Sequence, residues 1–186
     1  MPLPPPDRPR DPVQQRQIRI EGFRRDDDLW DVEGHLLDTL PNDVQVGGHW
    51  RRAGEAMHAM SLRLTVDRQA RIKAAVAVSD AHPFPGVCAT ITPAYAQLVG
   101  LQVGPGFRRR VQELFPASGG CTHLSELVIT LGTGVMQTLA GTLLRDPDVQ
   151  PFSLDGCHAL MTDGAVVRVF NDRGTYHCKA RINQRA

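Results

Sequence analysis

The chain lacks several features that define whole classes of protein. It contains no apolar run of roughly 18 residues, the length that a membrane-spanning helix requires, so we expect no membrane partner. It carries no excess of either charge: the formal net charge of +1 argues against a nucleic-acid partner, because such partners usually require a strong basic excess. The N-terminal segment has no apolar core of the kind that a secretory signal needs, so we expect a cytoplasmic protein.

Cysteine and aromatic residues are also scarce. The four cysteines are widely spaced and form no CxxC pair: Cys88, Cys121, Cys157 and Cys178. Free thiols in a reducing cytoplasm are the simplest interpretation, without a disulfide framework. Aromatic residues make up only 5% of the chain, so the core must rest on aliphatic side chains. A hydrophobic share of 41% over 186 residues is enough for one domain with a core of its own.

The pattern along the chain predicts an arm, then strands. Residues 1–16 are rich in proline and charge and are expected to form a disordered arm, with a single domain over residues 17–186. Alternating apolar and polar residues predict strands in "RQIRIEGFRRDD" and "LWDVEGHLLDTL". The segments "MHAMSLRLTV" and "ARIKAAVAVSD" predict a hairpin that turns at "DRQA".

Helical patterns follow the hairpin. Short helices are expected in "TPAYAQLVGL" and "PGFRRRVQELF", where a proline suits each helix start. From Thr122 to Leu139 apolar residues recur at helical spacing, which predicts one long helix. "GAVVRVFN" predicts a strand and "YHCKARI" a further one. The sum is an α+β fold, an antiparallel sheet with helices packed on one face.

His58 is placed unusually for a polar residue. In "MHAMSLRLTV" it shares a strand face with Met60, Leu62 and Leu64, because side chains alternate along a strand. Burying an imidazole unpaired is costly, so His58 must find a hydrogen-bond partner or a metal ion. In the alternative without a functional role, the ring donates a hydrogen bond to a backbone carbonyl.

The stretch "GGCTHLSEL" offers partners for His58. Thr122 suits a helix N-cap, and His123 and Glu126 then lie three residues apart on one helical face. They suit two ligands of a divalent metal, or a base and its orienting partner. Cys121, beside the positive end of the helix dipole, is a less favoured ligand. Glutamate is also favoured in a first helical turn whatever the function, so spacing alone leaves a structural role open.

A helix laid over the hairpin would bring these groups together. His58, His123 and Glu126 would then form a catalytic centre or a site of two histidines and one carboxylate. Such a set suits zinc or non-haem iron with open positions.

Four other residues are weaker candidates for substrate binding. His35 lies on the polar face of its predicted strand, and Asp38, three residues further on, points to the opposite face. Arg24 and Arg25 stand beside three aspartates; a solvated turn is the plain interpretation, and binding a carboxylate or phenolate is the functional one. His82 lies in the proline-rich loop "DAHPFPGVC", which suits the mouth of a pocket.

Taken together, "EGFRRDDDLWDVEGHLLDT", "AGEAMHAMSLRLTVD", "PAYAQLVGLQVGPGFRRRV" and "GCTHLSEL" resemble a bacterial family classed as a domain of unknown function, over about residues 18–160. The resemblance implies a role in the catabolism of lignin-derived aromatic compounds. The implied reaction is a carbon–carbon lyase step that releases formaldehyde from a hydroxymethyl-bearing aromatic dimer. That reaction needs a base and a group that stabilises the charge left behind. His58 and His123 would be the base candidates, with Glu126 or a metal assisting.

A second resemblance concerns the order of elements. A hairpin, a cysteine-bearing loop and a late helix are similar to iron–sulfur scaffolds of the NifU type, with Cys88 and Cys121 in the second and third cysteine places. Ala53 stands in the first place, so cluster assembly would lack one thiolate. A small-molecule enzyme, a metal-handling protein and a non-catalytic binding domain are thus three open functions, and homo-oligomerisation is open too.

Overall fold

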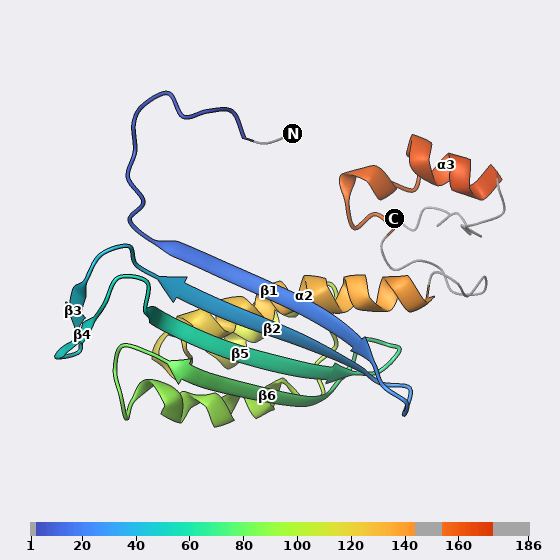
Figure 1. The fold of residues 1–186 in the computed structure, drawn as a ribbon. Coiled ribbons are helices and arrows are strands. Elements are labelled where there is room, and N and C mark those ends of the chain that lie inside the picture. Colours follow the sequence, from blue (N-terminus) through green and yellow to red (C-terminus); the bar gives the residue numbers. More distant parts are fainter. Residues whose placement is uncertain (1–2, 144–153, 173–186) are drawn as a thin grey trace.

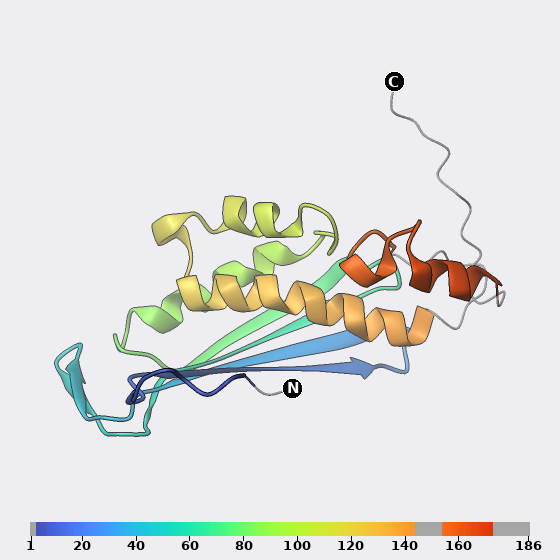
Figure 2. The ribbon, with the colours of Figure 1, turned by 90° about the horizontal axis from the view of Figure 1, so that it is seen from above.

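The protein forms two layers, an antiparallel sheet with helices on one face (Figures 1 and 2). The structure, a computed structural model, describes residues 3–143 and 154–172. The strands are β1 (Gln15–Arg24), β2 (Trp30–Thr39), β3 (Val44–Val46), β4 (His49–Arg51), β5 (Ala56–Val66) and β6 (Ile72–Ala81). The α-helices are α1 (Phe107–Leu114), α2 (Thr122–Leu143) and α3 (Ala165–Asp172), with 3-10 helices η1 (Cys88–Leu98), η2 (Ala117–Gly119) and η3 (His158–Leu160). The expected α+β class is confirmed.

The main sheet has the order β1-β2-β5-β6, and every neighbouring pair is antiparallel. Strand alternation determines which side chains enter the core. In β2, Trp30, Val32 and Leu36 are buried, and in β5 the same holds for Met60 and Leu62. The four strands expected before residue 82 and the hairpin turn between residues 67 and 71 are confirmed. His58 lies on the helix-covered face, where its ring stacks on that of His123.

Helix α2 covers this face because one side of it is apolar. The apolar side of the helix is fully buried against the sheet and includes Leu124, Leu127, Leu131 and Val135. Figure 2 shows the helix running along the sheet, and it contacts β1, β2 and β5. Gly134 permits this close approach: a Cβ there would lie 2.5 Å from the Ile20 side chain. Tertiary packing thus supports a helix that glycine alone would weaken.

Two sequence-based expectations differ from the structure. The strand expected in "GAVVRVFN" is wrong: the segment forms helix α3. A short run of valines fits either structure, and here Val167 is fully buried, whereas Val166 and Val169 are exposed. The first short helix is the 3-10 helix η1, which begins at Cys88 and holds Pro93 inside it. The strand expected in "YHCKARI" lies outside the described residues.

Two further features were not expected from the sequence. The short hairpin of β3 and β4 turns at Gly47 and Gly48, both with positive φ, as tight hairpins require. Strand β1 begins at Gln15, so Arg16 belongs to the sheet, although the arm was expected to extend that far.

In the parts of the chain that the structure describes, no helix has the length and hydropathy needed to cross a membrane.

Gly22 tests the packing of α2 on the edge strand. A Cβ at this position would meet Thr138, coming within 2.6 Å of its Cγ2 atom. We expect Gly22→Ala to lower the free energy of unfolding by about 1–3 kcal/mol, as overpacking does. Adding Thr138→Ala should return part of that loss, because it removes the two nearest atoms.

Urea denaturation of the single and double variants measures this coupling. Arg19→Ala, at an exposed position on the opposite face of β1, serves as the control and should change stability by no more than about 0.5 kcal/mol. Equal stability of Gly22→Ala and the parent chain would contradict the packing described here.

Candidate functional site

A row of polar side chains crosses three strands at one end of the sheet, on the face beneath α2. Arg16 of β1 lies opposite Asp38 of β2, and Asp38 lies opposite His58 of β5. Directly opposed residues on antiparallel strands have neighbouring side chains. The preceding row of the same face is Ile18, Leu36 and Met60, so the polar row lies where the apolar core ends.

Arg16 holds Asp38 by a paired contact. Its Nε donates to Oδ1 at 2.7 Å and its Nη2 donates to Oδ2 at 2.7 Å. The Asp38 side chain is only 7% exposed, and such burial by itself raises the pKa of a carboxyl group. The hydrogen bonds and charge of Arg16, aided by His58, outweigh burial and keep the pKa of Asp38 below its ordinary value. Asp38 is therefore ionised at neutral pH.

Asp38 in turn determines the tautomer of His58. The Nδ1 atom of His58 lies 3.0 Å from Oδ2 of Asp38. An ionised carboxylate only accepts hydrogen bonds, so Nδ1 carries the proton, and the lone pair of the neutral ring is at Nε2. Burial lowers the pKa of His58 and outweighs the opposite effect of Asp38, so the ring is neutral at pH 7.

His123 reaches the same place from the first turn of α2. Its ring stacks on that of His58, with centroids 3.7 Å apart and planes 29° from parallel. Its Nε2 lies 3.8 Å from Oδ2 of Asp38, beyond hydrogen-bond distance. Burial, followed by the nearby charges of His58 and Arg16, lowers the pKa of His123. Two neutral imidazoles therefore face each other beside one carboxylate.

A buried tyrosine fixes the start of α2. The Tyr95 hydroxyl accepts a hydrogen bond from the Cys121 N–H at 3.0 Å. The same hydroxyl lies 3.0 Å from the Cys121 carbonyl and 2.9 Å from Oγ of Ser125. Because these contacts pin the residue before the helix, they also determine where His123 projects. The Cys121 sulfur lies 3.9 Å from Nδ1 of His123.

The structure brings His58 and His123 together, but the carboxylate beside them is Asp38. Within the described residues, ligand atoms of Asp38, His58 and His123 lie within 4.8 Å of one another. Glu126 is exposed on α2 and acts on the site through its charge near Arg16. Cys121 adjoins His123 without joining this group.

The four weaker candidates for substrate binding lie in different parts of the molecule. His35 lies on the opposite face of the sheet, where its Nδ1 contacts Ser61 at 2.9 Å. Arg24 and Arg25 lie at the other end of β1 from Arg16 and pair with aspartates of their own turn. His82 follows β6, where its Nδ1 lies 3.1 Å from Oγ of Ser79, and it is not part of the Asp38, His58 and His123 group.

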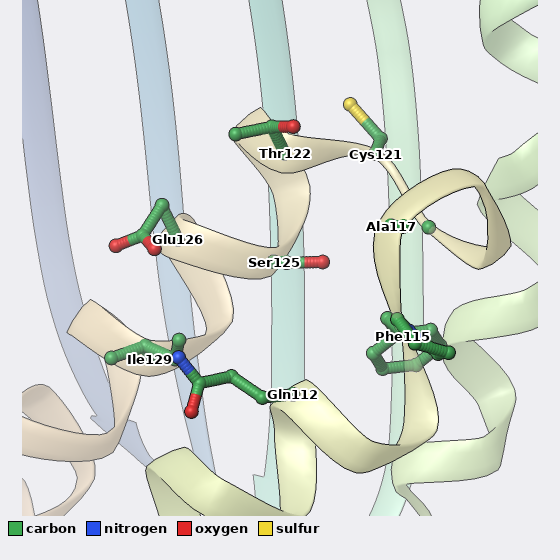
Figure 3. Close-up of a pocket in the computed structure, with 10 residues that line it drawn as sticks. Gln112, Phe115, Ala117, Cys121, Thr122, Ser125, Glu126 and Ile129 are labelled. Atoms are coloured by element: carbon green, nitrogen blue, oxygen red, sulfur yellow. The ribbon is translucent and has the colours of Figure 1, made fainter.

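A cavity of about 260 Å³ lies between α1 and the first turns of α2 (Figure 3). Gln112, Phe115, Cys121, Ser125 and Glu126 are among its lining residues. Asp38, His58 and His123 do not line it. The cavity is therefore separate from the paired imidazoles, although Cys121, one of its lining residues, lies next to His123.

The hydrogen bonds favour acid–base chemistry over metal binding. Oδ2 of Asp38 already accepts from Arg16 and from His58, and Oδ1 accepts from Arg16. A divalent ion would have to compete with a guanidinium for the only carboxylate in the group. Metal-free proton transfer needs no such change, because a carboxylate that orients a neutral imidazole is the usual partner of a general base.

Asp38 and Arg16 were not among the predicted site residues. A signal for Asp38 existed: the period-two pattern that buries Val32 and Leu36 also places Asp38 on the buried face. A buried carboxylate requires a cation, and strand pairing supplies Arg16. Sequence gives no register between β1 and β2, so this partner could not be identified beforehand.

Fold and site together define an α+β protein in which a buried aspartate is paired with a partly buried histidine, and a second imidazole stacks on that histidine. The chain belongs to the family described as "Protein of unknown function (DUF2889)", whose model matches residues 14–137. That range contains Arg16, Asp38, His58 and His123. Comparison with curated proteins and with solved structures finds no match.

Stability should depend on pH through the paired imidazoles. Both have folded-state pKa values below the ordinary value of about 6.5, so the unfolded chain binds more protons as the pH falls through that region. The free energy of unfolding should therefore decrease from about pH 7.5 to about pH 5.5. Asp38, with a lowered pKa, adds a further loss only near and below about pH 4.

Urea denaturation at both pH values measures this effect. The double variant His58→Gln/His123→Gln should show a smaller decrease than the parent chain. An identical decrease in the two proteins would show that the imidazoles are not held neutral by folding.

Proposed function

We propose that the protein is an enzyme that acts on a small aromatic molecule, with His58 as general base. The observation that supports this most is the contact of His58 Nδ1 with Asp38. It leaves the basic lone pair of the ring on Nε2, next to a second neutral imidazole. Asp38 would also stabilise the imidazolium that forms when Nε2 takes a proton. The His58 side chain is 13% exposed and that of His123 is 27% exposed, so a substrate would approach from the His123 side.

The reaction we propose is a carbon–carbon lyase step that releases formaldehyde from a hydroxymethyl group. His58 Nε2 takes the hydroxyl proton, and the oxygen electrons form the carbonyl bond of formaldehyde. The bond between the hydroxymethyl carbon and its neighbour breaks, and its electron pair stays on the neighbouring carbon. Proton transfer from an imidazolium to that carbon completes the reaction without an oxidant or a reductant. The family resemblance supports the substrate class, and the paired imidazoles support the proton transfers.

His58→Gln tests the general base. The variant keeps a polar side chain but loses the basic nitrogen, so we expect formaldehyde release from a hydroxymethyl-bearing aromatic dimer to fall about 10²–10⁴-fold. A colorimetric formaldehyde assay measures the rate. His35→Gln is the matched control, because His35 lies on the opposite face of the sheet, and it should retain the parent rate. Comparable rates in the two variants would refute a base role for His58.

A metal centre is the second candidate, supported by the three ligand atoms within 4.8 Å. Metal analysis of the purified protein distinguishes the two candidates. Metal-free catalysis predicts activity that survives chelation, with substoichiometric zinc and iron. Stoichiometric metal that is lost in His123→Ala and kept in Cys88→Ser would favour a metalloenzyme. Loss of metal in Cys88→Ser instead would favour a scaffold that uses thiolates.

A further inference from the structure

We infer that Arg16 is the group that binds an anionic oxygen of the aromatic ligand, as a phenolate-binding residue next to the two imidazoles. The inference rests on the proposed function, because it assigns the ligand chemistry of the same site. It concerns a residue that the sequence placed in the N-terminal arm and that the structure places in strand β1.

The geometry of the guanidinium supports this role. Arg16 uses Nε and Nη2, one edge of its planar fork, to hold both oxygens of Asp38. The other edge includes Nη1, which makes no hydrogen bond among the residues that the structure describes. The Arg16 side chain is 38% exposed, whereas Asp38 is 7% exposed, so the guanidinium has an outward-facing side. Bidentate pairing with Asp38 holds this side in a fixed orientation.

The position of the Arg16 guanidinium relative to the two imidazoles also supports a role in ligand binding. Arg16 Nη2 and His58 Nδ1 both contact Oδ2 of Asp38, and His123 stacks on His58, so a ligand oxygen bound to this guanidinium would lie near the two rings. Cleavage of the proposed carbon–carbon bond leaves an electron pair on the ligand. A fixed cation next to an ionised ring oxygen would hold the ligand in one orientation relative to His58 Nε2.

The negative charges around Arg16 limit its affinity for a phenolate. Asp38 neutralises much of the Arg16 charge, and the exposed Glu126 is close enough to act on Arg16. A bound phenolate would feel both carboxylates, so binding should be moderate and should depend on ionic strength. Arg24 and Arg25, the guanidinium groups first considered for this role, lie at the other end of β1 and pair with Asp28 and Asp27.

Binding of 4-nitrophenol to the full chain tests the inference without requiring turnover. The ionised form of this probe absorbs at longer wavelength than the neutral form, so absorbance reports both binding and the protonation state of the probe. The parent chain should bind the phenolate in preference to nitrobenzene and lower the pKa of the bound probe. Arg16→Gln should weaken phenolate binding roughly 10- to 100-fold, as expected for the loss of a hydrogen bond to a charged group, and leave nitrobenzene binding unchanged.

Two variants serve as matched comparisons. Arg19→Gln removes a guanidinium from the exposed face of the same strand and should bind the phenolate like the parent chain. Glu126→Gln removes the nearby negative charge and should bind the phenolate more tightly. Equal phenolate affinity in Arg16→Gln and the parent chain would overturn the inference, as would a parent chain that does not prefer the phenolate.

Arg16→Gln also removes a partner of a buried carboxylate, so its folding must be checked by circular dichroism. If it does not fold, arginine side-chain ¹⁵N resonances of the parent chain decide. The Arg16 signal, assigned from the Arg16→Lys spectrum, should shift on addition of 4-nitrophenolate; an unmoved signal would overturn the inference. His58→Gln should lose formaldehyde release but still bind the phenolate. Failure of the proposed reaction is thereby distinguished from failure of the Arg16 assignment.

Discussion

The pairing of Arg16 with Asp38 is the interaction on which the site depends. A carboxylate that is almost fully buried stays ionised only if a cation and hydrogen bonds replace the lost water. Arg16 supplies both from the neighbouring strand. Because Asp38 is ionised it can accept from His58, and because it accepts, the proton of His58 is fixed on Nδ1. Removing Arg16 would alter the chemistry of an imidazole that it does not touch directly.

The second constraint is the close packing of α2 on the sheet. Gly134 lets the helix approach Ile20 and Val32, and Gly34 of β2 lies against Leu127 and Leu131. This packing sets the height of the first helical turn above the sheet, and with it the position of His123. Stacking of His123 on His58 is thus a consequence of packing along the helix, together with the hydrogen bonds by which Tyr95 holds Cys121 at the start of the helix. The same burial that stabilises the fold keeps both imidazoles neutral.

Local patterns in the sequence predicted most of the fold and half of the site. Alternation located the four strands of the main sheet and the inward side of His58, and helical spacing located His123 at the start of α2. Spacing also suggested Glu126 as the carboxylate, because it lies one turn from His123. The structure places Asp38 there instead, since contacts across a sheet depend on strand register, which spacing within one segment does not reveal. The strand prediction for the valine-rich segment after Gly164 was wrong for a related reason: only tertiary packing distinguishes a short apolar strand from a short helix.

The most direct test of this account is the protonation of the His58 ring, measured by ¹⁵N NMR of the folded protein near neutral pH. The account predicts a hydrogen on Nδ1, a bare Nε2, and cross-peaks between the ring protons of His58 and His123. A hydrogen on Nε2, or rings without mutual cross-peaks, would contradict it. In that case the Asp38–His58 pair could not present a base to a ligand in the way described.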